Sequence, residues 1–362
     1  MTITSRFSFL VLLCAGAHAQ IRLNQIQVIG SHNSYHAGLA PSEAAWLRKV
    51  NPKAADGLEY KHPALDAQLS SGVRQVEIDI YADTEGGRYS HPANVKFVSS
   101  MGLPADPPFD PNGLFLKPGF KVMHAQDVDY RSNCQPLTGC LAVISNWSTA
   151  HPGHLPIFVL LETKEGRSRP EYQVDPEKFT PRVFDDLDKE IRSVFEPGRM
   201  IVPDDVRGRH ATLEKAVLAG EWPTLESARG KVVFLLDQRK AGPAYIAGHP
   251  SLQGRVIFTN AEPGSPDAAF VEVNDPLEDP ALIPAFVRKG YLVRTRTDAD
   301  TVEARTGDTK QRDAAIASGA QILSTDYPFD EKASWSGFSV SFPKGGIARC
   351  NPVLKMPSSC GL

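Results

Sequence analysis

The chain has 362 residues, of which 41% are hydrophobic and 22% charged, and its formal net charge at pH 7 is −3. This composition is that of a globular protein with enough length for a large hydrophobic core. The slightly negative charge, without a run of Lys or Arg, argues against a nucleic-acid-binding protein and against strong electrostatic attraction to anionic membranes.

The N-terminus predicts a signal peptide over residues 1–19. Arg6 precedes the apolar segment Phe7–Ala17, and Ala17-His18-Ala19 has the small residues of a cleavage site. The segment is too short to span a bilayer, and we expect no transmembrane segment elsewhere. A lipoprotein anchor at Cys14 is the alternative, although bulky Leu13 precedes it where a small residue is expected. We therefore expect a secreted or periplasmic protein whose mature chain, residues 20–362, is a single domain.

Four cysteines remain after removal of this segment. An even number in an exported chain favours disulfides, and the pairs Cys134–Cys140 and Cys350–Cys360 each close a short polar loop. A zinc site is the rival interpretation, but neither pair has the Cys-x-x-Cys spacing.

Short β-rich segments alternate with longer, often helical ones along the mature chain. This alternation predicts a parallel sheet in an α/β fold, and eight such units would close into a single (β/α)8 barrel of the TIM type, with the site at the carboxyl ends of its strands. Nine segments qualify as strands, so either Val256–Thr259 or Phe270–Asn274 would be peripheral. The predicted strands are Ile26–Gly30, Val73–Tyr81, Phe120–His124, Ile157–Lys164, Lys231–Asp237, Val256–Thr259, Phe270–Asn274, Tyr291–Arg296 and Gln321–Thr325. The predicted helices are Ser42–Val50, Pro63–Ser71, Pro181–Phe195, Leu213–Ala219, Ala281–Lys289 and Thr309–Ser318.

Two long segments interrupt this alternation, Thr84–Pro118 and Arg167–Pro176. Both leave the end of the sheet where the site is expected. They are interpreted as walls of the site or, alternatively, as surface decoration.

Polar residues with useful chemistry follow the first two predicted strands. Gly30 ends an apolar run, and His32 and Asn33 come directly after it, offering a proton carrier and a neutral oxygen ligand. In the second strand, Glu77 and Asp79 are two residues apart and therefore point to the same side. Two neighbouring carboxylates inside a barrel favour a bound metal ion, whereas on an edge strand they would be a solvated acidic face.

The third and fourth predicted strands end in the same manner. His124 ends the third, where a histidine serves either packing or proton transfer. Glu162 and Lys164 end the fourth, which is apolar enough to be buried on both faces. They either form a terminal ion pair or join the acidic pair of the second strand.

Together these residues suit phosphoryl transfer. The proposed ligands all bind through oxygen, which favours Ca²⁺ or Mg²⁺ over zinc. Two histidines handle protons, while a dication and a lysine offset charge on a phosphate.

The order of the motifs GSHNSYH, VEIDIY, VMHA and LLETK resembles the barrel of calcium-dependent phosphatidylinositol-specific phospholipases C. With VRTRTD and STDYP further on, the whole mature chain is similar to the secreted bacterial branch of that family. The resemblance implies one Ca²⁺ ion and cleavage of phosphatidylinositol to diacylglycerol and a cyclic inositol phosphate. It also implies roles for individual residues, with His32, His124 and Glu77 as catalytic groups and Asn33, Glu77, Asp79 and Glu162 as calcium ligands.

Substrate contacts are expected from Lys164, Arg294 and Asp237. Arg294 and Arg296 share one face of their strand, which is either inward toward the substrate or outward toward helix carboxylates. We expect no membrane-targeting module beside the barrel. A monomer that meets phosphatidylinositol at a membrane surface through its loops is therefore expected. The segment Pro104–Leu116, with Phe109, Leu114 and Phe115, is either an apolar rim for that contact or an ordinary hydrophobic plug.

Two other functions are weighed against this one. A glycerophosphodiester phosphodiesterase also combines a barrel, a dication and paired carboxylates, but there the first-strand histidine is usually followed by Arg and Gly rather than Asn33 and Ser34. A barrel that binds inositol lipids without turnover would be expected to lack one of the histidines or ligands.

Overall fold

The computed structural model describes residues 20–166, 174–356, 360 and 362. The predicted signal peptide, Cys14 and residues 167–173 of the second long loop lie outside the described residues.

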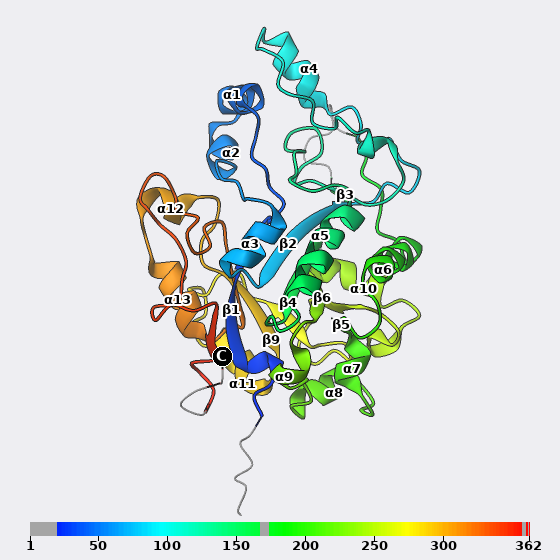
Figure 1. Ribbon diagram of the computed structural model, residues 1–362, viewed down its shortest axis with the longest axis vertical. Coiled ribbons are helices and arrows are strands. Elements are labelled where there is room, and N and C mark those ends of the chain that lie inside the picture. The colour runs from blue at the N-terminus through cyan, green and yellow to red at the C-terminus, as the bar shows by residue number, and fades with distance from the viewer. Residues whose placement is uncertain (1–19, 167–173, 357–359, 361) are drawn as a thin grey trace, which may run out of the picture.

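Eight parallel strands form the central sheet, and they curl into a barrel (Figure 1). In spatial order each strand pairs in parallel with the next, from β1 through β2, β4 and β6 to β7, and from β8 through β9 and β10 back to β1. Their bounds are β1 Ile26–Ser31, β2 Gln75–Tyr81, β4 Ile157–Thr163, β6 Val232–Leu236, β7 Ile257–Thr259, β8 Phe270–Glu272, β9 Leu292–Arg296 and β10 Ile322–Thr325.

The barrel is distorted because β7 and β8 are joined only by the isolated bridge between Asn260 and Phe270. Three short strands lie outside the ring: β3 Lys121–Val122, β5 Met200–Ile201 and β11 Ala348–Cys350. Of these, β5 and β11 extend the sheet beside the amino-terminal halves of β6 and β1. The predicted (β/α)8 architecture is confirmed in this irregular form.

One predicted strand has a different place from the one expected. Both β7 and β8 belong to the ring, and the peripheral strand is the one predicted at Phe120–His124. It shrinks to β3 and runs antiparallel to the end of β2, with Val122 opposite Ile80. The physical reason is that the long segment before it stays at the carboxyl end of β2. A chain that does not cross back to the amino end can pair only in the reverse direction.

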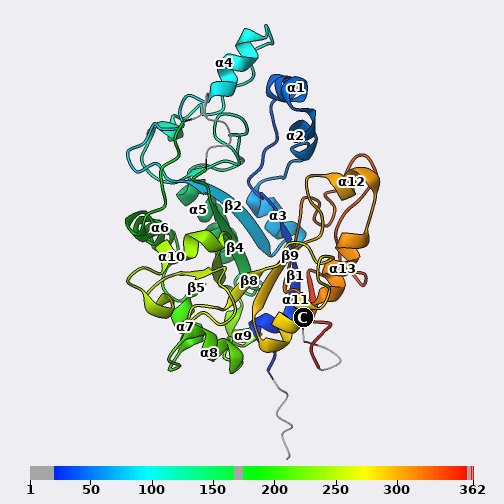
Figure 2. The same cartoon turned by 180° about the vertical axis from the view of Figure 1, so that it is seen from behind.

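Helices cover the outside of the sheet (Figure 2). Helix α6 illustrates why they form: Thr180 accepts a hydrogen bond from the Val183 N–H, Pro181 occupies the first turn, and Phe184 and Leu187 pack on the core. The α-helices are α1 Pro41–Val50, α2 Pro52–Gly57, α3 Leu65–Ser71, α4 Ala93–Ser100, α5 Leu137–Ala150, α6 Pro181–Val194, α7 Pro203–Arg207, α8 Leu213–Leu218, α9 Leu225–Ala228, α10 Gly242–Tyr245, α11 Leu282–Lys289, α12 Val302–Thr306 and α13 Lys310–Ser318. Four 3₁₀ segments accompany them at Leu23–Gln25, Leu114–Leu116, Arg239–Ala241 and Pro250–Leu252. None of the helices in the described ranges is long and apolar enough to cross a bilayer.

Helices α1, α2 and α4 stand together at one end of the molecule, while the C-terminus lies at the other (Figure 1). They come from the loops that follow β1 and β2, so they rise above the carboxyl ends of the strands. Helix α4 belongs to the first long segment. Within it Phe109 and Phe115 pack with Tyr130 in a small apolar cluster, so these two rings form a plug, whereas Leu116 at the end of the segment is 62% exposed.

Both expected disulfides are present. Cys134–Cys140 ties the loop before α5 to its first turn, with 5.1 Å between the Cα atoms. Cys350–Cys360 ties the chain end to β11, with 5.8 Å between the Cα atoms.

Candidate active site

Three carboxylates from adjacent strands meet at the carboxyl end of the barrel. Asp79 of β2 lies directly beside Glu162 of β4 in the parallel register, and Glu77 precedes Asp79 by two residues on the same face. One oxygen of each of the three lies within 4.8 Å of the others. Glu77 and Asp79 are buried, and Glu162 is partly exposed. The strand register therefore makes a compact set of hard oxygen ligands.

Two cations offset part of the charge of this acidic cluster. Lys164 Nζ is 2.9 Å from Asp79 Oδ2 and 2.7 Å from Glu162 Oε2. Arg294 Nη2 donates to Glu77 Oε2 at 2.7 Å. Burial nevertheless raises the pKa of Glu77 to about 8. The neighbouring carboxylates raise this pKa further, and Arg294 lowers it only in part. Burial also raises the pKa of Asp79 well above its ordinary value. A bound dication would relieve both effects.

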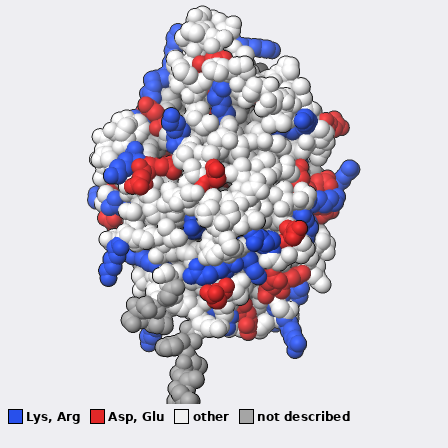
Figure 3. Space-filling model, viewed as in Figure 1, with Lys and Arg blue, Asp and Glu red and all other residues white. Residues whose placement is uncertain are grey.

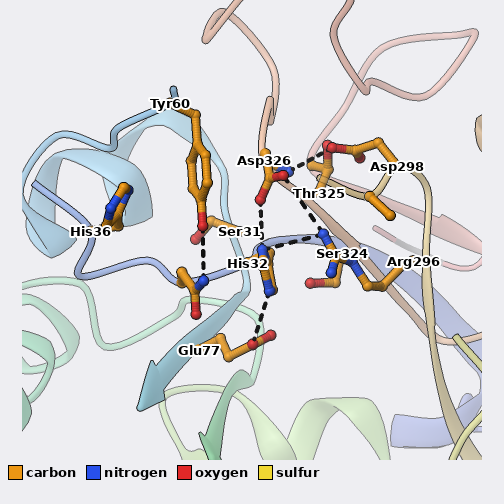
Figure 4. A network of polar contacts seen from close by, with 12 residues as sticks. Ser31, His32, His36, Tyr60, Glu77, Arg296, Asp298, Ser324, Thr325 and Asp326 are labelled. Carbon is orange, nitrogen blue, oxygen red and sulfur yellow. Dashed lines mark hydrogen bonds and ion pairs between the residues drawn. The ribbon is translucent and has the colours of Figure 1, made fainter. Parts of the chain in front are cut away.

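His32 follows β1 and lies between two carboxylates (Figure 4). Its Nδ1 is 2.6 Å from Asp326 Oδ1, and its Nε2 is 3.5 Å from Glu77 Oε1. Arg296 Nη2 is 3.3 Å from the same Nδ1. Burial, together with Arg296 and Arg294, lowers the pKa of His32 well below its ordinary value. Asp326 thus fixes the ring so that Nε2 faces the acidic cluster.

Asn33 is held in place by the backbone of the loop after β1. It has a left-handed conformation, with φ of 46°, which an asparagine tolerates better than most residues. The next residue, Ser34, donates its N–H to Glu77 O and accepts the Glu77 N–H on its Oγ. The Tyr35 hydroxyl donates to Asn33 Oδ1 at 3.3 Å and also interacts with Asp79. The amide oxygen of Asn33 is therefore one hydroxyl away from the acidic cluster.

His124 follows β3 and keeps 29% of its side chain exposed. Its Nδ1 is 3.0 Å from Asp129 Oδ2. Asp129 is fully buried and also lies 3.0 Å from His36 Nε2. Burial alone would raise the pKa of Asp129, but the two rings outweigh it and hold that pKa below its ordinary value. Asp129 is thus an anion that orients His124.

Both candidate catalytic histidines open into one cavity of 940 Å³. Its walls come from α1, α2, α4 and α12, and they include Trp46 and Phe97, whose rings stack at 5.2 Å. The first long segment is therefore a wall of the site, as predicted, because Phe97 lies in α4 within it. The floor is polar and the walls are largely apolar, which suits an amphiphilic ligand.

The family model for Ca²⁺-dependent phosphoinositide phospholipases C matches residues 21–352. The chain belongs to this family. Its members are Ca²⁺-dependent phospholipase C enzymes, so membership establishes the class of enzyme and implies a phosphoinositide substrate. A comparison with curated protein sequences found no match.

Solved structures of similar fold include family enzymes from bacteria. A calcium-dependent phosphoinositol-specific phospholipase C from the Gram-negative bacterium Pseudomonas sp. matches over 91% of this chain and 95% of its own, with 16% identity and a TM-score of 0.53. A Ca²⁺-dependent phosphatidylinositol-specific phospholipase C from Streptomyces antibioticus matches over 84% and 95%, with 19% identity and a TM-score of 0.49. The first likeness shows that the distorted barrel is shared.

The donor set fits the calcium ion on which the family depends. Glu77, Asp79 and Glu162 supply carboxylate oxygens, which Ca²⁺ prefers. Oδ2 of buried Asp79 is paired with Lys164 at 2.9 Å, whereas Oδ1 accepts no well-aligned hydrogen bond from the described residues and can face a cation.

The structure brings the residues singled out from the sequence to one end of the barrel. Arg294 points inward, with only 2% of its side chain exposed, and Arg296 follows it on the same face beside His32. Asp237 comes directly after β6, and burial with nearby Glu162 raises its pKa. The roles of these residues remain predictions, although their places agree with them.

Four further residues of the site were not assigned from the sequence. Asp326 follows β10 as Asp237 follows β6, so its position directly after a strand was an available signal. Glu272 lies on the inner face of β8, with its Oε2 3.9 Å from Arg294 Nη1. His36 ends the motif GSHNSYH but was given no role, and no local pattern marked Asp129, because the two side chains meet through a contact between distant loops.

Proposed function

We propose that this enzyme cleaves phosphatidylinositol to diacylglycerol and a cyclic inositol phosphate, with Ca²⁺ bound by Glu77, Asp79, Glu162 and Asn33. The observation that carries the proposal is the acidic cluster lying beside His32, with Glu77 Oε1 3.5 Å from His32 Nε2. A bound Ca²⁺ supplies positive charge that offsets the phosphate and favours ionisation of a nearby hydroxyl.

Glu77 accepts the proton of the inositol 2-hydroxyl, whose oxygen attacks phosphorus. Burial raises the pKa of Glu77, and a bound Ca²⁺ would oppose that rise and keep the carboxylate ionised, as a base at neutral pH must be. His32 donates a hydrogen bond from Nε2 to a phosphate oxygen. Burial and the nearby arginines lower the pKa of His32 and oppose the charged ring, whereas Asp326 beside Nδ1 and the anionic phosphate favour it when substrate is bound. Developing negative charge is thereby met by a donor already in place.

His124 protonates the glycerol oxygen as it leaves. Its Nδ1 is engaged by Asp129 and its side chain is 29% exposed, which leaves Nε2 to hold the proton. The same nitrogen later accepts a proton from water if the cyclic product is opened.

The inositol ring contacts Lys164, Arg294 and Asp237, whose polar groups suit its hydroxyls. The glycerol and the first part of the acyl chains occupy the cavity beneath Trp46 and Phe97. The lipid then enters from the end of the molecule that carries α1 and α4, where Val50 and Val95 are 46% and 52% exposed. This arrangement supports contact with a membrane surface through that end.

We also infer that the enzyme is exported and acts as a monomer. Two disulfides are consistent with an oxidising compartment. Figure 3 shows Lys and Arg interspersed with Asp and Glu on one face, without one dominant sign of charge. N-terminal sequencing of the exported protein should begin at Gln20, and light scattering should give the mass of one chain.

The product assay tests the proposal. Purified enzyme, vesicles containing phosphatidylinositol and Ca²⁺ should give diacylglycerol and cyclic inositol phosphate, and a calcium chelator should stop the reaction. His32→Ala and His124→Ala should each reduce turnover about a hundredfold or more. Release of glycerol phosphate would indicate a glycerophosphodiesterase instead, and lipid binding without product would indicate a non-catalytic barrel.

A further inference from the structure

We propose that His36 is a positioning residue that acts through Asp129 to hold His124 in place for protonating the leaving group. The inference rests on the proposed function, because it takes His124 to be the general acid. His36 touches neither proposed calcium-binding carboxylates nor the cavity. It ends the motif GSHNSYH, yet the mechanism above gives it no role.

The contact chain from His36 to His124 is continuous. His36 Nε2 lies 3.0 Å from Asp129 Oδ2 and 3.2 Å from Oδ1, so its N–H donates to the carboxylate. The same Oδ2 accepts from His124 Nδ1 at 3.0 Å. The His36 and Asp129 side chains are both 0% exposed, whereas His124 is 29% exposed. Two rings thus share one buried carboxylate, and only the outer ring reaches the cavity.

Backbone contacts fix the two loops that carry these side chains. His36 forms a β-bridge with Ser132, and Ala125 forms one with Asp129. The Asn133 N–H donates to Tyr35 O at 2.8 Å, which adds a second tie between the loops. The His36 ring packs on Tyr60, with 4.6 Å between ring centroids, and Figure 4 shows it beside Tyr60 on the side away from His32. His36 is therefore held rigidly enough to serve as a fixed anchor for Asp129.

The chemistry of the leaving-group step explains why this anchor matters. As the inositol 2-oxygen bonds to phosphorus, the bond from phosphorus to the glycerol oxygen breaks, and the proton on His124 Nε2 passes to that oxygen. Glu77 takes the proton of the 2-hydroxyl, so atoms and charges balance. Transfer requires the Nε2–H to lie close to the leaving oxygen and to point at it. A partly exposed ring is not oriented by packing alone, so its direction depends on Asp129. Hydrogen bonds to an ionised carboxylate are short and strong, and the second one, from His36, prevents Asp129 from rotating away.

The leaving group itself provides the readout. Phosphatidylinositol loses an alkoxide, which needs a proton, whereas an inositol phosphodiester of an acidic phenol loses a stable phenolate without one. His36→Leu should reduce kcat on phosphatidylinositol about tenfold or more, with KM within about twofold, and should change kcat on the phenyl ester by less than about threefold. His36→Gln keeps an N–H donor toward Asp129 and should recover most of the lost rate.

Reference variants separate the possible outcomes. His124→Ala must show the same dependence on the leaving group; if it slows both substrates equally, His124 is not the general acid and the proposed function is wrong at that step. If His124→Ala shows the dependence but His36→Leu slows both substrates equally, His36 is merely structural and the inference is overturned. His154→Gln, at a buried histidine away from the site, should slow neither substrate selectively. Should His36→Leu fail to fold, Asp129→Asn must show the leaving-group dependence, and its absence there also overturns the inference.

Discussion

Arg294 is a buried cation that offsets the negative charge of Glu77 and Glu272, on the side of the site where the inositol headgroup is proposed to bind. It is buried, and it joins Glu77 at 2.7 Å to Asn274 at 2.6 Å, with Glu272 at 3.9 Å. A buried cation of this kind is stable only while its carboxylate partners remain. Arg294 therefore links the proposed base to a second acidic residue that a ring hydroxyl would meet.

Replacement of Glu272 by Gln should weaken headgroup binding more than it slows chemistry. Glu272 lies beside Asp237, and burial raises its pKa well above the ordinary value, so it offers a hydroxyl-binding carboxyl at the end of β8. We expect KM for phosphatidylinositol to rise about threefold to tenfold, with kcat within about threefold, and inhibition by free myo-inositol to weaken in parallel, since one hydrogen bond is lost. Steady-state kinetics check this. Exposed Glu278→Gln is the matched control, and an unchanged KM in Glu272→Gln would remove this residue from the headgroup contact.

At the scale of single residues, the sequence predicted which side chains share one face of a strand, because side chains alternate between the two faces. Alternation along one strand placed Glu77 with Asp79, and Arg294 with Arg296, and the structure confirms both pairs on the inner face. Strand alternation did not indicate the contact between Asp129 and His36, because that contact depends on which loops meet in space. Contacts between distant segments leave no periodic pattern in the sequence from which they could be predicted.

At the scale of elements, helix α4 supplies part of the apolar wall of the cavity above the barrel. It arises within a segment rich in Pro and Gly, where no helix was predicted, because its eight residues carry only a weak apolar pattern. Its Phe97 faces Trp46 over the cavity, and its Val95 is exposed. The long segment was interpreted from its sequence as a wall of the site or as surface decoration, but the helix within it, which packs against α1, was not predicted.

Val95→Asp should impair action at a membrane without impairing the chemistry. A charge on the exposed end of α4 opposes insertion among acyl chains, where a valine gains about 1.5–3 kcal/mol when fully buried. We expect about a tenfold loss of activity on phosphatidylinositol vesicles and no more than a twofold change on a water-soluble inositol phosphodiester. Leu218→Asp is the matched control, because Leu218 is 51% exposed on α8, at the other end of the molecule (Figure 1). Equal losses in the two variants would indicate a general effect and not membrane contact.

The junction between α5 and β4 should make stability sensitive to acid. His154 is buried there, with Nε2 2.7 Å from Ser148 Oγ and Nδ1 2.6 Å from Leu155 O. Burial lowers the pKa of His154 to about 4, against 6.5 for a free ring. The unfolded chain therefore binds a proton as pH falls through 6.5, while the folded protein does not until about pH 4.

Stability from this residue is thus present above pH 6.5 and is lost between pH 6.5 and 4. Urea unfolding at pH 7, 6 and 5 should show wild type losing more free energy of unfolding than His154→Gln, in which nothing titrates. Parallel losses in the two proteins would contradict the prediction.

At the scale of the whole molecule, the barrel gathers groups that are distant in the chain. The alternation of strands and helices was enough to predict the architecture, because parallel strands carry their carboxyl ends to one side. It was not enough to predict which strand lies outside the ring. That depended on β3 returning antiparallel along β2, a consequence of where a long loop ends in space and not of the strand's own residues.

Calcium should stabilise the folded protein as a whole. Folding brings one oxygen of each of three carboxylates within 4.8 Å of the others, an arrangement that the unfolded chain does not have. An ion that binds only the folded state adds about 2.7 kcal/mol to the free energy of unfolding when its concentration is a hundred times Kd. Thermal unfolding should therefore shift upward with added Ca²⁺, and less with Mg²⁺, which adapts poorly to an irregular set of carboxylates.

The shift should diminish in Glu162→Gln, which removes one carboxylate while leaving Glu77 paired with Arg294. Glu196→Gln, at an exposed acid on the protein surface, should retain the full shift and thereby exclude a nonspecific salt effect. Calorimetry with and without chelator measures both variants. A calcium-induced shift of the same size in Glu162→Gln and wild type would mean that the stabilising ion binds elsewhere, and it would separate the cluster at the ends of β2 and β4 from the calcium dependence of the family.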